Sequence, residues 1–261
     1  MKKAIIIGAS SGIGRELAKI LAANQYEVGL TARRIDLLLS LQEEIKSHTG
    51  RTWIKQMDLA QTDLAIASVK ALIEEMGGVD LFVINAGVNH FIHDLNWDKE
   101  KEIINLNVLG FCAMANVAIE HFFAKKAGHL VGISSISALR GIGMTAAYTG
   151  SKAFVSNYLQ GLRQKCFPLR KSITITDIKP GYVDTRLMTK DISHWVASPQ
   201  KAAEQIYTAI RKKVDHAYIT KRWRFVGWAI KLTPQFFYDW AVSKSCRKLN
   251  SKISTDDRIF P

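Results

Sequence analysis

Short apolar runs alternate with longer amphipathic segments along most of the chain, and no other feature of the sequence constrains the fold as much. Strands that are apolar on both faces and joined through helices form parallel sheets covered on both sides. We therefore expect an α/β fold with a doubly wound, Rossmann-type parallel sheet of about seven strands. The apolar runs predict strands over residues 4–7, 28–31, 52–57, 81–84, 129–134, 173–178 and 217–219. Helical spacing predicts helices up to about residue 23, over 35–45, after the third strand, over 97–123, over 147–167 and from 199 onward. The segment 97–123 is expected to hold two helices, the second entering at residue 107.

Length and charge predict one domain with a basic C-terminal extension. The chain has 261 residues, 48% of them hydrophobic, which is enough for one sizeable core. We expect the Rossmann-type domain over residues 1–220 and a basic, aromatic-rich extension, not an independent domain, over 221–261. The formal net charge is +13, and residues 211–261 contribute 12 Lys and Arg against 4 Asp. The extension therefore needs an explanation of its own.

Cysteine usage and hydropathy exclude several classes of protein. The three cysteines show no spacing typical of a disulfide framework or a zinc site, so we expect a reducing compartment and no metal. The apolar run after Met1 is too short for a signal peptide. No uninterrupted apolar stretch approaches the roughly 18 residues of a spanning helix. We expect a cytoplasmic protein that does not cross a membrane.

A glycine-rich turn separates the first predicted strand from the first predicted helix. It reads Gly-Ala-Ser-Ser-Gly-Ile-Gly over residues 8–14. A dinucleotide pyrophosphate needs backbone N–H groups at a helix N-terminus, with no Cβ in the way. Glycines also serve structural turns, but the strand–turn–helix context favours a nucleotide site. The cofactor-binding residues expected here are Gly8, Ser10, Ser11, Gly12, Ile13 and Gly14.

The end of the second predicted strand indicates which dinucleotide binds. NAD sites usually place an acidic residue there for the ribose 2′-hydroxyl, whereas an arginine suits a 2′-phosphate. This strand ends in Arg33 and Arg34, with no acid. Two solvated arginines are the alternative, but the planar guanidinium of Arg33 can pair with the phosphate or stack on adenine. We expect NADP(H) rather than NAD(H).

A serine, a tyrosine and a lysine follow in an order that suggests acid–base chemistry. Ser135 comes after the fifth predicted strand, where open α/β sheets bind ligands. Tyr148 and Lys152 are four residues apart, so they lie one turn apart on a helix face. The ammonium is expected to lower the tyrosine pKa below its usual value, and Tyr148 could then exchange a proton with a carbonyl oxygen. The pair means little alone, and its value lies in this order along the chain.

Taken together, these motifs resemble the short-chain dehydrogenase/reductase family, in the branch with short single-domain subunits, from Lys3 to about Lys212. The resemblance implies that Tyr148 is the general acid/base, Ser135 orients the substrate oxygen, and Lys152 tunes the tyrosine and binds the nicotinamide ribose. It also implies that Asn107 holds a water in the proton relay. Further cofactor contacts are implied at Asp58, Leu59, Asn85, Ala86, Gly87, Tyr148, Lys152, Pro180, Gly181, Val183 and Thr185. One departure weakens the NADP(H) prediction: some NADPH-using relatives have a basic residue where this chain has Ser11.

The substrate pocket is expected beyond the carboxyl ends of the strands. Its residues would be Val88, His90, Phe91, His93, the segment 142–145 and the segment 182–196. A catalytic histidine is disfavoured because the relay is complete without one. Leu187, Met188 and Trp195 lie on an expected lid and suggest an apolar or bulky substrate, although simple burial of the loop would explain them equally.

The basic, aromatic extension has two interpretations. Charged and aromatic residues interleave at roughly helical spacing over 221–240, as in helices that lie in a membrane interface. The alternative is that the apolar face docks on the core or on another subunit. Nucleic-acid binding is disfavoured because no known binding module is present.

The sequence therefore predicts an NADP-dependent oxidoreductase that transfers a hydride between NADP(H) and a carbonyl or secondary alcohol, with an apolar or lipid-like substrate. A non-catalytic NADPH-binding regulator or scaffold and a cofactor-retaining epimerase or dehydratase are the alternatives. The family resemblance implies a homodimer or homotetramer that pairs through the helices near Asn107 and Tyr148. Peripheral attachment to a membrane surface would be compatible with a cytoplasmic location.

Overall fold

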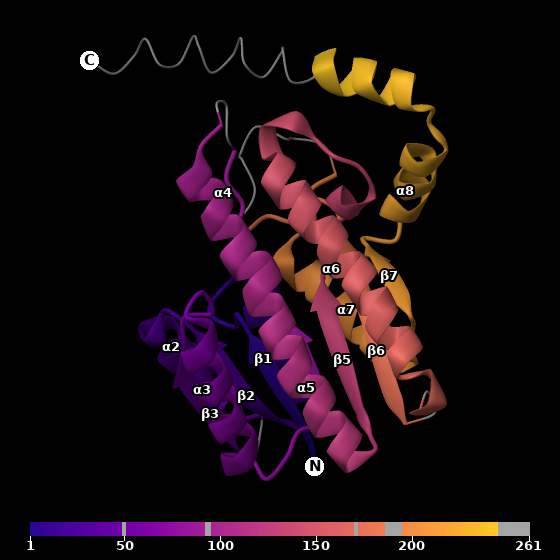
Figure 1. The fold of residues 1–261 in the computed structure, drawn as a ribbon. Coiled ribbons are helices and arrows are strands. Elements are labelled where there is room, and N and C mark those ends of the chain that lie inside the picture. The colour runs from indigo at the N-terminus through magenta and orange to yellow at the C-terminus, as the bar shows by residue number, and fades with distance from the viewer. Residues whose placement is uncertain (49–50, 92–94, 170–171, 186–194, 245–261) are drawn as a thin grey trace, which may run out of the picture.

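The computed structural model describes residues 1–48, 51–91, 95–169, 172–185 and 195–244. Seven parallel strands form one sheet in the order β3-β2-β1-β4-β5-β6-β7, as expected for a doubly wound fold. Their carboxyl ends point to the top of Figure 1, and the N-terminus lies at the bottom. The strands are β1 Lys2–Ile7, β2 Tyr26–Ala32, β3 Thr52–Gln56, β4 Leu81–Ile84, β5 Gly128–Ile133, β6 Ile173–Pro180 and β7 His216–Ile219.

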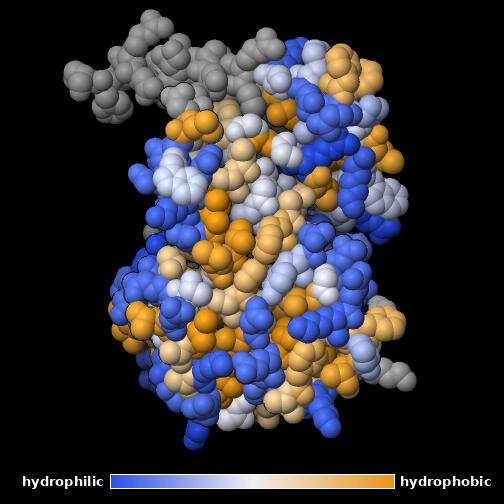
Figure 2. All heavy atoms as spheres, in the orientation of Figure 1, coloured by the Kyte–Doolittle hydropathy of each residue, from blue (hydrophilic) through white to orange (hydrophobic). Residues whose placement is uncertain are grey.

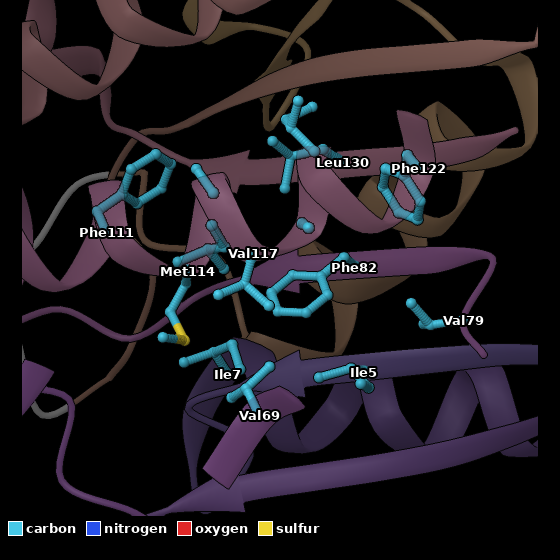
Figure 3. Packing of buried hydrophobic residues seen from close by; sticks show 14 of the residues in the cluster. Ile5, Ile7, Val69, Val79, Phe82, Phe111, Met114, Val117, Phe122 and Leu130 are labelled. Atoms are coloured by element: carbon cyan, nitrogen blue, oxygen red, sulfur yellow. The ribbon is translucent and has the colours of Figure 1, made fainter. Parts of the chain in front are cut away.

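Helices cover both faces of the sheet, because its central strands are largely apolar on both sides. One buried cluster joins the sheet to α3, α5 and α6, and the other joins it to α1, α2 and α7. Figure 3 shows the first cluster, where Phe82 on β4 lies beside Val117 of α5 and Val69 of α3 lies beside Ile7 of β1. The helices are α1 Gly12–Ala23, α2 Ile35–Ile45, α3 Thr62–Glu75, α4 Trp97–Ile104, α5 Phe111–Lys125, α6 Ala146–Lys165, α7 Pro199–Lys212 and α8 Trp223–Leu232.

The segment expected to hold two helices is continuous instead. A π-helical turn, Asn105–Gly110, joins α4 to α5 without a break, so the helical path runs from Trp97 to Lys125. By length and composition alone, this path is the one candidate membrane span in the described part of the chain. Of its apolar window, 56% is buried inside the fold. Its apolar residues, including Met114 and Phe122, pack against the sheet and supply the core.

The C-terminal extension is helical where it is described. After β7, α8 is followed by a second helical segment at residues 235–244, and Thr233-Pro234 separates the two. We call residues 221–244 the C-terminal helix pair. It lies at the top of Figure 1, beyond the carboxyl ends of β5 and β6. The expected domain boundary near residue 220 stays a prediction.

Candidate active site

A cavity of about 930 Å³ opens at the carboxyl ends of the strands. It brings together residues from β1, β2, β5, α6, the end of β6, the segments after β4 and β6, and the C-terminal helix pair. Two of the expected site residues, Gly14 and Asn107, are not on its surface and support it from behind. The expected residues that line it are Gly8, Ser10, Ser11, Gly12, Ile13, Arg33, Asp58, Leu59, Asn85, Ala86, Gly87, Ser135, Tyr148, Lys152, Pro180, Gly181, Val183 and Thr185.

The glycine turn is shaped by close backbone approaches. Gly8 has φ +88°, and a Cβ there would lie 2.8 Å from the Ala86 backbone. A Cβ on Gly14 would collide with the carbonyl of Gly8 and lie 2.6 Å from the side-chain amide of Asn85. That amide donates to the Gly8 carbonyl at 2.8 Å, so β4 fixes the turn that follows β1. The turn therefore has the open backbone that a pyrophosphate at the N-terminus of α1 requires.

Both arginines after β2 line the cavity, and the sequence singled out only one of them. Arg33 is exposed and lines the cavity. Arg34 donates from Nη2 to the hydroxyls of Ser10 and Ser11, both at 2.9 Å. Two cationic side chains therefore border the part of the cavity where an adenosine ribose would lie. Adjacent arginines give no sequence signal that distinguishes their directions.

The segment after β4 continues the cofactor side of the cavity. The N–H groups of Asn85 and Ala86 both donate to the Ile7 carbonyl, at 3.0 and 2.9 Å. This fixes the end of β4 to the end of β1. On the other side, a Cβ on Gly110 would meet the Leu59 backbone, so the π-helical turn packs directly on the Asp58–Leu59 segment.

Ser135, Tyr148 and Lys152 meet on the other half of the cavity. Ser135 begins the short helix Ile136–Leu139, and its Oγ accepts the Ser137 N–H at 3.0 Å. Tyr148 and Ser135 share a hydrogen bond. Lys152 Nζ lies 5.8 Å from the centre of the Tyr148 ring and donates to the Ile133 carbonyl at 2.9 Å. The three expected catalytic side chains therefore share one surface.

The electrostatics of this group differ from the expectation. Burial raises the pKa of Tyr148, and the hydrogen bond with Ser135 opposes that shift in part. The predicted lowering of the tyrosine pKa by Lys152 is therefore wrong for the free protein, because desolvation of the phenolate is the largest effect. Burial also lowers the pKa of Lys152 to about 8. The phenol of Tyr148 therefore keeps its proton at neutral pH.

Asn107 is buried in the π-helical turn and organises the neighbouring strand end. Its Oδ1 accepts from the Val88 N–H and its Nδ2 donates to the Val88 carbonyl, both at 2.9 Å. The same amide donates to Ser151 Oγ on α6 at 3.1 Å. A Cβ on Gly87 would lie 3.3 Å from Lys152 Nζ and 3.4 Å from Asn107 Oδ1, so these groups converge on one place. The role of Asn107 in a proton relay stays a prediction.

A buried polar network behind the site was missed by the sequence reasoning. Asp177 on β6 accepts from the hydroxyls of Ser134 and Ser156, and it pairs with Lys179. Burial lowers the pKa of Lys179 to about 8. The network fixes the backbone immediately before Ser135. Its only sequence signal is Asp177 inside a predicted buried strand, with Lys179 just past the predicted end, where unpaired charge would be unfavourable.

Two glycine contacts shape the segment after β6. Gly181 donates its N–H to the Ile219 carbonyl at 2.6 Å, and Trp223 packs where a Gly181 side chain would lie. A Cβ on Gly12 would lie 3.0 Å from Thr185, so this segment closes over the glycine turn. Pro180, Gly181, Val183 and Thr185 therefore reach the cavity as expected.

The substrate side of the cavity differs in part from the expectation. Val88, Phe91 and Tyr182 line it as expected, but His90 does not. His90 Nε2 instead lies 2.7 Å from Glu102 on α4. From the segment 142–145, Ile142, Met144 and Thr145 line the cavity. His93, Leu187 and Met188 lie outside the described residues, and Trp195 is described but is not part of the lining.

The C-terminal helix pair forms a wall of the cavity that the sequence did not predict. Tyr238, Ala241 and Val242 line the cavity. Tyr238 donates from its hydroxyl to the Gly141 carbonyl at 3.0 Å. Arg140 lies 5.1 Å from the centre of the Tyr238 ring and donates to the Thr233 carbonyl at 2.6 Å. The loop between Ser135 and Tyr148 is therefore attached to residues more than 90 positions later.

The described residues contain no group of three or more His, Cys, Asp or Glu side chains that could hold a metal ion. The cavity instead has an open glycine turn with two arginines at one end and a Ser–Tyr–Lys group at the other. That arrangement fits an extended dinucleotide whose reactive end lies beside a proton donor.

Comparison with known proteins agrees with this geometry. Residues 2–196 match the short chain dehydrogenase family. A protein of Myxococcus xanthus (strain DK1622), named only as an oxidoreductase, is 36% identical over 189 residues, which are 71% of this chain and 74% of that protein.

Solved structures share the fold at low sequence identity. A short-chain dehydrogenase from Sphingobium yanoikuyae in complex with NADPH is 20% identical, with a TM-score of 0.77 and coverage of 96% of both chains. A 3-oxoacyl-[acyl-carrier protein] reductase from Brucella melitensis in complex with NAD is 21% identical, with a TM-score of 0.75 over 84% of this chain and 96% of that one. Structural relatives thus hold either nicotinamide dinucleotide. With a sequence match over residues 2–196, the chain belongs to the short-chain dehydrogenase/reductase family of oxidoreductases.

Proposed function

We propose that this protein transfers a hydride between NADP(H) and a carbonyl or secondary alcohol, with Tyr148 as general acid/base. The observation that carries the proposal is the shared surface of Ser135, Tyr148 and Lys152 inside the cavity that the glycine turn also lines. Bound NADP(H) would supply the hydride for reduction or accept it for oxidation.

The side chains of this chain would then handle the proton. In reduction, the Tyr148 hydroxyl donates its proton to the substrate oxygen while Ser135 hydrogen-bonds that oxygen. The raised pKa of Tyr148 keeps the proton on the phenol until it is needed. The ammonium of Lys152, 5.8 Å from the ring centre, stabilises the phenolate that remains.

The two arginines after β2 support NADP(H) over NAD(H). A 2′-phosphate beside Arg33 and Arg34 would form charge-assisted hydrogen bonds, whereas the described lining offers no acid at the end of β2 for a ribose 2′-hydroxyl. Some NADPH-using relatives have a basic residue at the position of Ser11. In this chain the guanidinium of Arg34 supplies a positive charge there, because it hydrogen-bonds the hydroxyls of Ser10 and Ser11.

The reaction is tested with a Tyr148→Phe variant. We expect turnover to fall by at least about a thousandfold, because the proton donor is lost, while NADPH affinity stays within about twofold. NADPH oxidation, followed as absorbance loss with a panel of ketones, aldehydes and quinones, measures turnover, and NADPH fluorescence titration measures affinity. Retention of most of the activity would contradict the assignment. NADPH binding without net consumption would favour the regulator or the epimerase.

The cofactor preference is tested with an Arg33→Asp variant. We expect its affinity for NADPH to fall by about a hundredfold, because a charge-assisted contact is replaced by like-charge repulsion. Its affinity for NADH should stay the same or rise. Equal losses for both cofactors would indicate a damaged fold, and no loss for either would remove Arg33 from the site.

The proposal also covers assembly and location. Leu109 in the π-helical turn and Phe154 on α6 are 53% and 41% exposed, and Figure 2 shows apolar residues gathered on the face where these helices lie. This supports a homodimer or homotetramer paired through that face. The apolar residues Ala241 and Val242 in the cavity wall support an apolar substrate. The proposed location is cytoplasmic, with peripheral attachment to a membrane surface.

A further inference from the structure

The C-terminal helix pair has one face against the protein. On α8, Trp223 packs over Gly181, and a Cβ on Gly227 would meet the ring of Tyr218. On the second helix, Tyr238 and Val242 are four residues apart and both line the cavity. This inner face attaches the pair to the substrate side of the site.

The outer face of the same pair is apolar and exposed. On α8, Phe225, Trp228 and Leu232 recur at helical spacing, and Leu232 is 82% exposed. On the second helix, Phe236, Phe237 and Trp240 are exposed, Phe236 by 75%. Six large apolar side chains within 24 residues are far more than the scattered exposed residues of an ordinary surface.

Basic side chains frame these aromatic rings. Within residues 221–244 there are five Lys or Arg residues and one Asp, a net charge of +4. Arg224 lies 5.2 Å from the centre of the Trp228 ring, and Lys244 lies 5.3 Å from that of Trp240. Each cation is therefore placed beside an exposed ring, as in interfacial helices whose rings enter the acyl boundary while the cations contact headgroups.

The charge pattern distinguishes between possible occupants of this face. A symmetric dimer formed through it would oppose two surfaces of net charge +4, which repel each other. A nucleic acid would neutralise the cations but leave Phe225 and Leu232 in water. An anionic lipid surface satisfies both the cations and the apolar side chains.

The second helix of the pair also lines the cavity. Tyr238, Ala241 and Val242 line the cavity, while Phe236, Phe237 and Trp240 of the same helix point outward. Arg140 and Tyr238 connect this helix to the loop between Ser135 and Tyr148. A lipid surface that contacts the outer face would therefore lie beside the cavity, at the top of Figures 1 and 2.

We propose that the C-terminal helix pair seats the cavity entrance on an anionic lipid surface, from which an apolar carbonyl substrate enters. The proposed lipid contact rests only on the residues of the C-terminal helix pair. The proposed entry of a substrate from the lipid also rests on the proposed function. Such a substrate would carry an acyl chain or another apolar group that partitions into the bilayer.

Vesicle co-sedimentation of the full chain tests the lipid contact. The vesicles are phosphatidylcholine alone or with phosphatidylserine. We expect binding to the phosphatidylserine vesicles that weakens with salt. A Trp228→Ser/Trp240→Ser variant and, separately, a Lys231→Glu/Lys244→Glu variant should each lose at least about tenfold in affinity. Phe167→Ser is the matched control, because Phe167 is 63% exposed but lies past the far end of α6. It should bind as the unmodified protein does.

The outcomes separate this inference from the proposed function. No binding to anionic vesicles, or equal binding by the Trp and control variants, overturns it. A change of oligomeric state in the Trp variant without vesicle binding assigns the face to a second copy and also overturns it. In the kinetic arm, anionic vesicles should lower the KM for a long-chain ketone and leave that for a short, water-soluble ketone unchanged. If neither ketone is reduced, the proposed function fails while the co-sedimentation result still decides the lipid contact.

Discussion

The two halves of the cavity are built by different means. The cofactor half is made of backbone: glycines that allow close approach and N–H groups that tie the end of β4 to β1. The substrate half is made of side chains from distant parts of the chain. Arg140, for example, donates hydrogen bonds to Lys231, Thr233 and Gln235. A backbone site tolerates little change, whereas a side-chain wall can vary and still leave the chemistry intact. We therefore expect substitutions in the side-chain wall to change substrate preference more than the chemistry.

In the comparison of the two halves, the largest effect is expected in the cofactor half, from Gly14→Ala. The new Cβ would collide with the Gly8 carbonyl and lie 2.6 Å from Asn85, so the turn must shift. We expect NADPH affinity to fall by about a hundredfold or more, and the free energy of unfolding to fall by about 1–3 kcal/mol. NADPH titration and denaturant unfolding measure the two.

Gly161→Ala is the matched control for that variant. Gly161 also lies inside a helix, but nothing lies within 4 Å of its Cβ position. Alanine there should stabilise the protein by about 1 kcal/mol and leave NADPH affinity unchanged. If Gly14→Ala behaved like this control, the cofactor half would not be limited by its backbone.

A pH dependence is expected at Lys152, where the two halves meet. Its pKa is lowered to about 8 in the free protein, so it is charged below that pH and neutral above it. The kcat/KM for NADPH reports the free enzyme, and it should be level below pH 8 and fall about tenfold per unit above it. Tyr148 does not cause this limb because its pKa is raised. A profile that stays level through about pH 9.5 would contradict a role for the charged lysine.

A smaller and more selective effect is expected at Arg140. Arg140→Gln removes the contacts to Thr233 and to the Tyr238 ring. We expect the KM for a long-chain ketone to rise about tenfold, equivalent to about 1.4 kcal/mol, while kcat and the KM for NADPH stay unchanged.

Arg163→Gln is the comparison for Arg140. Arg163 also donates to distant backbone carbonyls, those of Ile175 and Asp215, but they lie outside the cavity lining. This variant should lower stability without changing any KM. Equal KM changes in both variants would mean that KM depends on the overall stability of the protein and not on the contacts of Arg140.

The sequence predicted the parts of the molecule that depend on local patterns. The central strands are largely apolar on both faces, and the glycine turn and the Tyr148–Lys152 spacing are local, so the sheet and most of the cavity lining were foreseeable. The direction of the Arg34 side chain could not be foreseen, because it depends on hydrogen bonds to Ser10 and Ser11, which only the folded chain brings close. The link from Arg140 to residues 231–235 joins segments whose proximity only the folded chain determines.

The sequence also misjudged the balance of forces on Tyr148. The spacing identified a nearby cation but not the burial of the phenol, and burial proved the larger influence on its pKa. The Asp177–Lys179 pair was overlooked for a related reason. Within an apolar strand two charges look unfavourable, and only the fold brings Ser134 and Ser156 beside them.

The π-helical turn at Asn105–Gly110 determines how the two ends of its helix are rotated relative to each other about the helix axis. A turn closed by an i→i+5 bond holds one more residue than an α-turn, and each residue rotates an α-helix by about 100°. Deleting one residue there would leave regular α-helical spacing and rotate one end of the helix against the other by about 100°. Either Asn107 would turn away from Val88, or the core face of α5 would turn away from the sheet. The one extra residue of the π-helical turn therefore lets Asn107 face the candidate site while α5 faces the core.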